Sequence, residues 1–175
     1  MPKGAETLIK EDERKVLHEL LEDSGQSVNV IAKKLGFSRQ KVWRIIKQLE
    51  KNNTIWGSTA VVDETKIGQK SYTVLIRRTT EPLSGELTSK IIKRNIEPAA
   101  KKLGVMIDSS FYVHGMYDWI ICFSAEDIGD AKQFGDVLLR AYTGYIADLQ
   151  ILETLFWIQK HGRINPEREK LKKFL

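Results

Sequence analysis

One stretch of the sequence, residues 38–51, carries side chains suited to binding a nucleic acid. Apolar residues recur there at i, i+3, i+4 and i+7, which predicts a helix with one buried face: Val42, Ile45, Ile46 and Leu49. The opposite face is basic and also holds an aromatic and an amide side chain: Arg39, Gln40, Trp43, Arg44, Lys47 and Lys51. Ser38 is a good N-cap, because its hydroxyl can accept a hydrogen bond from a free N–H of the first turn. Such a helix suits the major groove of DNA. A solvated surface helix is the alternative.

The chain before this helix favours the DNA-binding interpretation. Asp12 can cap a first helix that runs to about Asp23, and a second helix spans residues 28–35 at helical apolar spacing. Gly36 follows, where a left-handed glycine ends a helix. Two short helices joined by a tight glycine turn form a helix-turn-helix motif, in which residues 39–51 are the recognition helix.

The basic residues divide into two expected roles. Side chains near the start of a recognition helix reach base edges, which predicts base contacts for Arg39, Gln40, Trp43 and Arg44. The lysines further along, together with two on the preceding helix, are expected at phosphates: Lys47, Lys51, Lys33 and Lys34. Plain solvation of Lys33 and Lys34, and an internal bracing role for Arg44, are the alternatives.

The sequence that follows predicts a wing and a linker. Asn53 can take the left-handed conformation that stops the recognition helix. Residues 55–62 are predicted to be extended and to form the wing of a winged helix-turn-helix. Trp56 is assigned to packing on this wing or on a partner subunit rather than to DNA. Residues 63–70 are polar and predict a linker.

The second half of the chain alternates strand and helix patterns. Strands are predicted at residues 72–77, 110–113, 119–123 and 145–158. Helices are predicted at residues 86–103, with an interruption near Pro98, and from about residue 127 to 139. The order β-α-β-β-α-β is the ferredoxin-like arrangement, in which helices cover one sheet face. The strand at residues 119–123 is continuously apolar and is expected to be buried on both faces. The other sheet face is expected to stack on a second copy.

The fold class is therefore α+β, in four segments. Residues 1–62 form a winged helix-turn-helix DNA-binding domain, 63–70 a linker, and 71–160 a βαββαβ effector-binding and oligomerisation domain. Residues 161–175 form a tail, predicted to be helical from Asn165 with Pro166 in its first turn.

Composition limits the function classes. The 175 residues carry a net charge of +5, and residues 33–51 hold seven cations against the single carboxylate Glu50. One cysteine, Cys122, excludes an intrachain disulfide or a cysteine-rich zinc site, and the three histidines are too scattered for a metal site. No signal peptide and no apolar run of ~18 residues is present, so a cytoplasmic protein without membrane contact is expected.

Three motifs together resemble the Lrp/AsnC family of feast/famine and leucine-responsive transcription regulators. The first is the helix-turn-helix pattern from Ile31-Ala32 through Leu35-Gly36 to Leu49-Glu50. The second, along the wing and hinge, is Ile55 and Gly57, then Val62-Asp63 and Ile67-Gly68. The third is Gly115-x-Tyr117-Asp118 before an apolar strand. The resemblance covers residues 11–158.

The resemblance implies a DNA-binding regulator that forms dimers and often higher oligomers. It also implies an amino-acid effector near the Gly-x-Tyr-Asp turn and the last strand, at His114, Gly115, Met116, Tyr117, Asp118, Asp148 and Gln150. Asp118 is expected to accept the ligand's amine or to cap its own turn, and His114 to line the pocket, to sense pH or to be structural. Members often carry threonine or serine soon after the glycine that precedes the last strand, whereas this chain has Asp148 and Gln150 there, which change the polarity of any pocket.

The same architecture also occurs in an enzyme class, the siroheme decarboxylases. Those enzymes resemble this family but carry a segment rich in histidine and arginine around the second strand. Here residues 108–114 contain one histidine and no arginine. The sequence therefore favours a regulator that is not an enzyme and needs no cofactor. A ligand-binding protein without DNA activity would lack the basic helix face.

Overall fold

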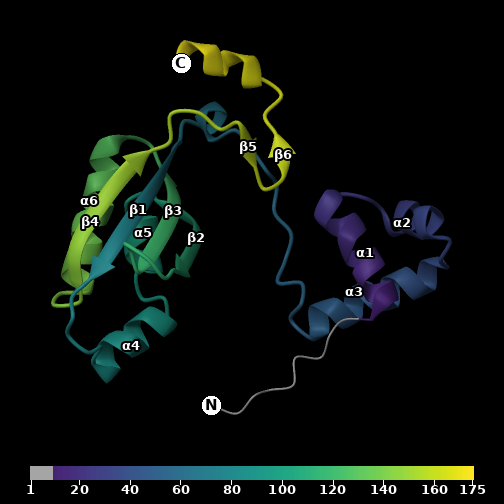
Figure 1. Ribbon diagram of the computed structural model, residues 1–175, viewed down its shortest axis with the longest axis horizontal. Helices are drawn as coiled ribbons and strands as arrows, with labels where there is room; N and C mark the ends of the chain where they lie inside the picture. The colour runs from purple at the N-terminus through teal and green to yellow at the C-terminus, as the bar shows by residue number, and fades with distance from the viewer. Residues whose placement is uncertain (1–9) are drawn as a thin grey trace. The chain divides into compact units, whose positions relative to one another are not determined.

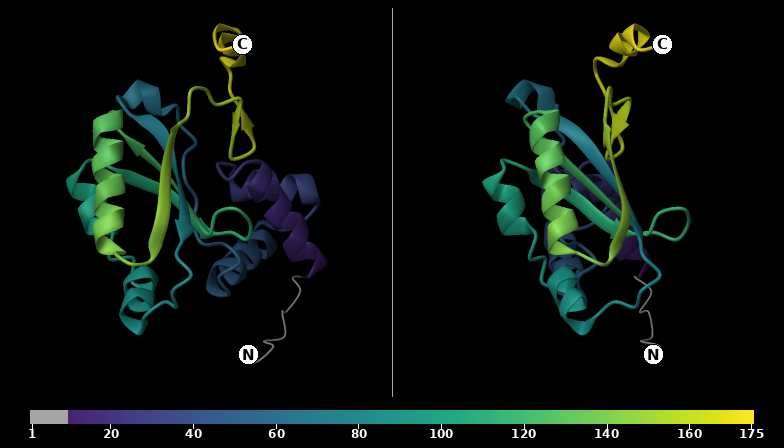
Figure 2. Two further views of the ribbon diagram at one scale, coloured as in Figure 1. Left: turned by 60° about the vertical axis from the view of Figure 1, so that its left-hand side comes forward. Right: turned by 90° about the vertical axis from the view of Figure 1, so that its left-hand side faces the viewer.

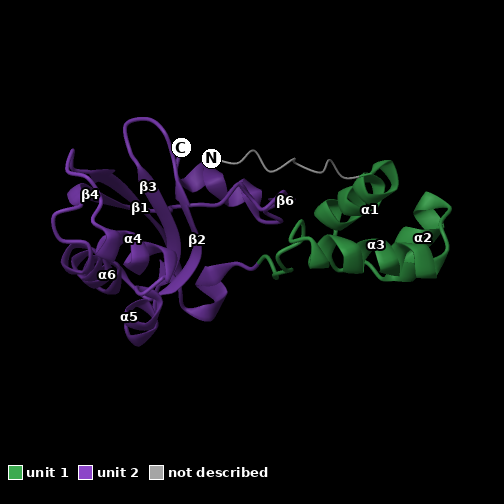
Figure 3. Cartoon of the chain, turned by 90° about the horizontal axis from the view of Figure 1, so that it is seen from below, with its two compact units in different colours: residues 1–61 green, residues 62–175 purple. Residues whose placement is uncertain are grey.

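The computed structural model describes residues 10–175. The chain divides into two compact units, residues 1–61 and residues 62–175, drawn in different colours in Figure 3. The elements are labelled in Figure 1.

The first unit is a three-helix cluster. It consists of α1 (Glu11–Glu22), α2 (Val28–Leu35) and α3 (Arg39–Lys51), as the apolar spacing predicted. A small core joins the three helices and is formed by Val16, Ile31, Ala32, Val42, Ile45 and Leu49. The first helix begins two residues earlier than predicted: Lys10 is its N-cap, and Asp12 lies inside the first turn.

Local chemistry sets the ends of the helices around the turn. Gly36 has φ 65°, the left-handed conformation that glycine adopts without steric cost, so α2 ends there. The hydroxyl of Ser38 accepts a hydrogen bond from the backbone N–H of Lys41 at 3.2 Å, which begins α3. Asn53 has φ 60° just after α3, as predicted. Residues 55–63 form no strand or helix, so the segment predicted as the wing pairs with no strand of the described chain.

The second unit contains a four-stranded antiparallel sheet in the order β2-β3-β1-β4. Its strands are β1 (Lys70–Arg78), β2 (Met106–Tyr112), β3 (Trp119–Ala125) and β4 (Ile146–Glu153). The ferredoxin-like prediction is confirmed. The first crossover contains two helices, α4 (Gly85–Ile92) and α5 (Glu97–Lys102), and the second contains α6 (Ile128–Ala141). The predicted interruption is present: a new helix, α5, begins at Glu97, and Pro98 occupies its first turn.

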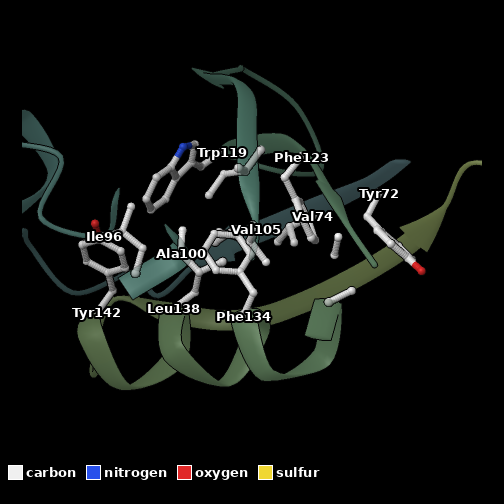
Figure 4. Close-up of a cluster of buried hydrophobic side chains, with 14 of the residues drawn as sticks. Tyr72, Val74, Ile96, Ala100, Val105, Trp119, Phe123, Phe134, Leu138 and Tyr142 are labelled. Carbon is white, nitrogen blue, oxygen red and sulfur yellow. The ribbon is translucent and has the colours of Figure 1, made fainter. Parts of the chain in front are cut away.

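The helices cover one face of the sheet, as Figure 2 shows for α5 and α6. Strand β1 alternates so that Tyr72, Val74 and Ile76 are buried toward α6, where Phe134 and Leu138 meet them (Figure 4). On the opposite face, the apolar or small side chains of Leu75, Ile120 and Cys122 are only partly buried. The prediction that residues 119–123 are buried on both faces is therefore wrong, because no layer of the described chain covers that face completely.

The C-terminal part differs most from the sequence prediction. The last long strand, predicted to reach residue 158, ends at Glu153. A short hairpin follows, made of β5 (Gln159–Lys160) and β6 (Arg163–Ile164). The predicted helix at Asn165 is instead a 3-10 helix, η2 (Arg168–Lys173), and Pro166 lies before it. The apolar residues after Glu153 pair with no sheet strand because the chain leaves the sheet, which a strand-like composition cannot reveal.

Two side-chain contacts join this C-terminal segment to the first residues of the second unit. Within the predicted linker, Glu64–Ile67 forms a short 3-10 helix, η1, in which Glu64 is the only buried carboxylate among the described residues. Lys160 forms an ion pair with Glu64, and the side chains are 15% and 11% exposed. Trp157 Nε1 donates to Ser71 Oγ at 3.1 Å.

Among residues 10–175, no helix has the length and apolar character that crossing a membrane requires.

Candidate nucleic-acid interface and effector site

An α-helix completes one turn every 3.6 residues, so residues three or four positions apart lie on the same face. In α3 this places the apolar side chains on one face and the basic side chains on the other. Val42, Ile45 and Leu49 point into the core of the first unit, which fixes the rotation of the helix about its axis. That rotation leaves the opposite face exposed to solvent. We call it the α3 outer face, and it consists of Arg39, Gln40, Trp43, Arg44, Lys47 and Lys51.

The cations of this face differ in whether the chain already neutralises them. Arg39, Arg44 and Lys51 form no ion pair with any residue of the described chain, so their charge faces solvent. Lys47 Nζ lies 2.7 Å from Glu50 Oε2. Lys41 faces the other way: its Nζ lies 2.6 Å from Asp12 Oδ2 on α1, which lowers the pKa of the Asp12 carboxyl through the hydrogen bond.

The two lysines at the end of α2 differ in the same way. Lys34 Nζ contacts Glu19 Oε2 at 2.7 Å and lowers the pKa of that carboxyl by hydrogen bonding. Lys33 is exposed and has no ion-pair partner among residues 10–175. The structure therefore distinguishes two neighbours that the sequence treated alike.

Ser38 has a structural role, since its hydroxyl is the cap of α3. The cap also leaves the first backbone N–H groups of α3 at an exposed helix N-terminus, which favours negative charge nearby. Arg44 is exposed, and no internal bracing contact from its side chain is present in the described chain. Trp56, which was assigned to packing, is 95% exposed, and its indole N–H donates to Asn53 O at 2.8 Å.

In the second unit, the predicted effector residues fall into two groups. Tyr117 and Asp118 directly precede β3, and Asp148 and Gln150 lie toward the start of β4, so all four stand near the end of the sheet where β1 ends. The Tyr117 hydroxyl donates to Gln150 Oε1 at 3.0 Å, and Gln150 Nε2 donates to Asp148 Oδ2 at 3.3 Å. We call these four residues the polar cluster.

The remaining predicted effector residues lie on the exposed loop between β2 and β3. His114 and Gly115 are exposed, and Met116 is 79% exposed. His114 makes no hydrogen bond or ion pair with the described chain. These three residues do not contact the polar cluster through any such interaction.

Sequence reasoning missed the partner of Asp118. The backbone N–H of Arg78 donates to Asp118 Oδ2 at 2.9 Å, and Arg78 Nε lies 3.6 Å from Oδ1. Asp118 therefore contacts the end of β1, whereas the capping alternative placed its contact within its own turn. Arg77, which precedes Arg78 in β1, lies opposite Asp148 in the β1–β4 register. The pair Arg77-Arg78 at a strand end was the available signal, but linking it to Asp118 requires the strand order.

Comparison with known families identifies the class of the first unit. Residues 13–55 match the family described as winged helix-turn-helix DNA-binding. The first unit therefore has the helix-turn-helix architecture that this family describes, and α3 is the second helix of the motif. No curated protein matches the chain.

Solved structures share the fold of most of the chain, across both units. An AsnC family transcriptional regulator from Agrobacterium tumefaciens aligns over 95% of this chain and 100% of its own, with TM-score 0.64 and 23% identity. A transcriptional regulator from Neisseria meningitidis in complex with L-methionine aligns over 95% of this chain and 99% of its own, with TM-score 0.67 and 15% identity. AsnC of E. coli aligns over 87% and 96%, with TM-score 0.56 and 16% identity. The chain has the two-domain fold of Lrp/AsnC regulators, which confirms the resemblance at the level of the fold.

Proposed function

We propose that this protein is a sequence-specific DNA-binding transcription regulator of the Lrp/AsnC type. The observation that carries the proposal is the α3 outer face, where Arg39, Arg44 and Lys51 have no partner within the described chain. Cations held on the exposed side of a recognition helix suit duplex DNA, because they can release counterions from phosphates or bond guanine edges. The proposal assigns the protein no catalytic role.

The test is a gel-shift titration of the full chain with the DNA upstream of its own gene. The variant Arg39→Ala/Arg44→Ala/Lys47→Ala is expected to abolish the shift. A matched control removes three exposed cations from the helical region of the second unit: Lys93→Ala/Lys101→Ala/Lys102→Ala. Both variants lose the same charge, so a purely non-specific charge effect would weaken them equally. Unchanged binding by the α3 variant contradicts the proposal.

We further propose that a small molecule such as an amino acid modulates this regulator at the polar cluster. Support comes from the cluster of hydroxyl, amide and carboxylate groups at one sheet end, and from the L-methionine complex of the similar Neisseria meningitidis regulator. Arg78 already contacts both oxygens of the Asp118 carboxylate, so an amine that binds there would share this carboxylate with Arg78.

A thermal-shift screen of the twenty amino acids tests this effector role. At least one amino acid is expected to raise the unfolding temperature of the full chain. Tyr117→Phe removes the hydroxyl that bonds Gln150 and is expected to reduce that shift, while Tyr142→Phe, a buried tyrosine of the core, serves as the control. The absence of a shift with all twenty excludes an amino-acid effector.

The assembly we propose is a homodimer, with higher homo-oligomers built from it. Its support is the sheet face opposite the helices, where Leu75, Ile120 and Leu152 expose apolar surface. Light scattering is expected to report at least twice the mass of one chain. Leu75→Lys at the centre of this face is expected to lower that mass. A monomer in the unchanged protein contradicts the proposed assembly.

A further inference from the structure

Trp43 differs from the other tryptophans of this chain. Three of the four donate their indole N–H within the chain: Trp56 to Asn53 O, Trp119 to Ser110 Oγ and Trp157 to Ser71 Oγ. Trp43 makes no hydrogen bond, ring contact or cation–π contact with residues 10–175, and it is 54% exposed. Its place among the cations of the α3 outer face, rather than its exposure alone, calls for an explanation outside the fold, because single exposed apolar side chains are common on protein surfaces.

Stability does not supply that explanation. Trp43 is the fifth residue of α3, and the buried side of the helix is already filled by Val42, Ile45 and Leu49. Tryptophan is also a weaker helix former than alanine or arginine, so helix propensity does not favour it at this position.

The side chains around Trp43 indicate which kind of binding partner it contacts. Arg39 lies one turn before it and Lys47 one turn after it on the same face, since residues four apart on a helix are adjacent. Arg44 follows it directly. An apolar ring surrounded by cations suits a polyanion that also presents an apolar group, and a protein partner with an apolar surface would leave those cations unpaired.

In the major groove the only apolar group on a base edge is the C5-methyl of thymine. We propose that Trp43 is a specificity-determining residue that contacts a thymine methyl, so that the binding site carries thymine where Trp43 lies. The first half of a recognition helix is the part that reaches base edges, which is where Trp43 stands. This inference rests on the proposed DNA-binding function.

The test removes single methyl groups from the DNA. Sites are first selected from a random duplex library with the full chain. Each thymine of the best site is then replaced by deoxyuridine, which lacks only the C5-methyl, and affinities are compared by fluorescence anisotropy. One thymine in each half-site is expected to lose about fourfold in affinity, the effect of burying one methyl-sized apolar group.

Protein variants then assign that loss to one side chain. Trp43→Ala is expected to bind the methylated and demethylated sites equally, whereas Trp43→Phe, which keeps a ring but lacks the N–H, retains part of the discrimination. Trp56→Ala, an exposed tryptophan outside α3, is the matched control and keeps the full discrimination. Circular dichroism melting checks that each variant is folded.

The outcomes separate this inference from the function beneath it. Tight binding with no thymine dependence, or the same dependence in the wild type and in Trp43→Ala, overturns the role of Trp43 and leaves DNA binding intact. Failure of the unmodified protein to select any duplex overturns both. If Trp43→Ala does not fold, Trp43→Phe supplies the comparison, and a thymine dependence in that variant equal to that of the wild type overturns the role of Trp43.

Discussion

Lys33 and Lys34 are adjacent in sequence but should contribute unequally to DNA binding. Lys34 is neutralised by Glu19 at 2.7 Å, whereas Lys33 has no ion-pair partner in the described chain. Both stand in the last turn of α2, the helix that crosses the DNA backbone in this class of domain. We therefore predict that Lys33→Ala weakens DNA binding in a salt-dependent way and that Lys34→Ala has a smaller effect.

The magnitude follows from counterion release. Each phosphate contact contributes ~0.9 to the slope of log affinity against log salt concentration, so losing one contact in each protomer of a dimer reduces the slope by ~1.8. Between 50 mM and 200 mM salt, one such contact corresponds to roughly a 3.5-fold change in affinity. For Lys34 we expect less than half of that change in slope, because Glu19 already offsets its charge.

The assay is a series of anisotropy titrations of one DNA duplex by the wild type and both variants at five salt concentrations. Thermal unfolding of each variant controls for loss of structure, since Lys34→Ala also breaks the contact with Glu19. Equal slope changes for the two variants, or a larger change for Lys34→Ala, would refute the reasoning that ion pairing decides which lysine binds phosphate.

Two further predictions concern stability. Lys160→Met leaves the nearly buried Glu64 carboxylate without a counter-charge, and it should lower the free energy of unfolding in urea by ~3 kcal/mol. The double variant Glu64→Gln/Lys160→Met removes both charges and should recover most of that loss. Equal losses in the two variants would argue against a charge effect. The lowered pKa of Asp12, caused by Lys41, means that the folded state holds this carboxylate ionised more strongly than the unfolded chain does. Its contribution is present above the unfolded pKa near the ordinary value of 3.8 and disappears as pH falls through the lower folded pKa, so the gap in melting temperature between the wild type and Asp12→Asn should close below about pH 4. A gap that widens in acid would contradict this sign.

The secondary structure of the first unit could be predicted from sequence because its signals are local. The apolar positions of α3 repeat at helical spacing, and Ser38, Gly36 and Asn53 mark helix ends through their own backbone preferences. The order of strands in the second unit was likewise predictable, because it follows from the succession of elements and the rules of the ferredoxin-like arrangement.

The contacts of the candidate sites could not be predicted, because they join residues far apart in sequence. Asp118 meets Arg78 forty residues away only because β1 and β3 are neighbours, and Lys160 meets Glu64 across 96 positions. The end of β4 was also missed. The apolar composition of residues 154–158 fits a strand, but whether a strand exists depends on a partner strand.

The central claim, that the α3 outer face binds duplex DNA, is tested most directly by site-specific photocrosslinking. A benzophenone amino acid placed at Gln40 on α3, or at Lys132 on the exposed side of α6, is incorporated into the full chain, and the complex with a selected duplex is irradiated. We predict a protein–DNA crosslink from position 40 and none from position 132. A crosslink from position 132 alone, or none from position 40 while DNA binding persists, would contradict the claim.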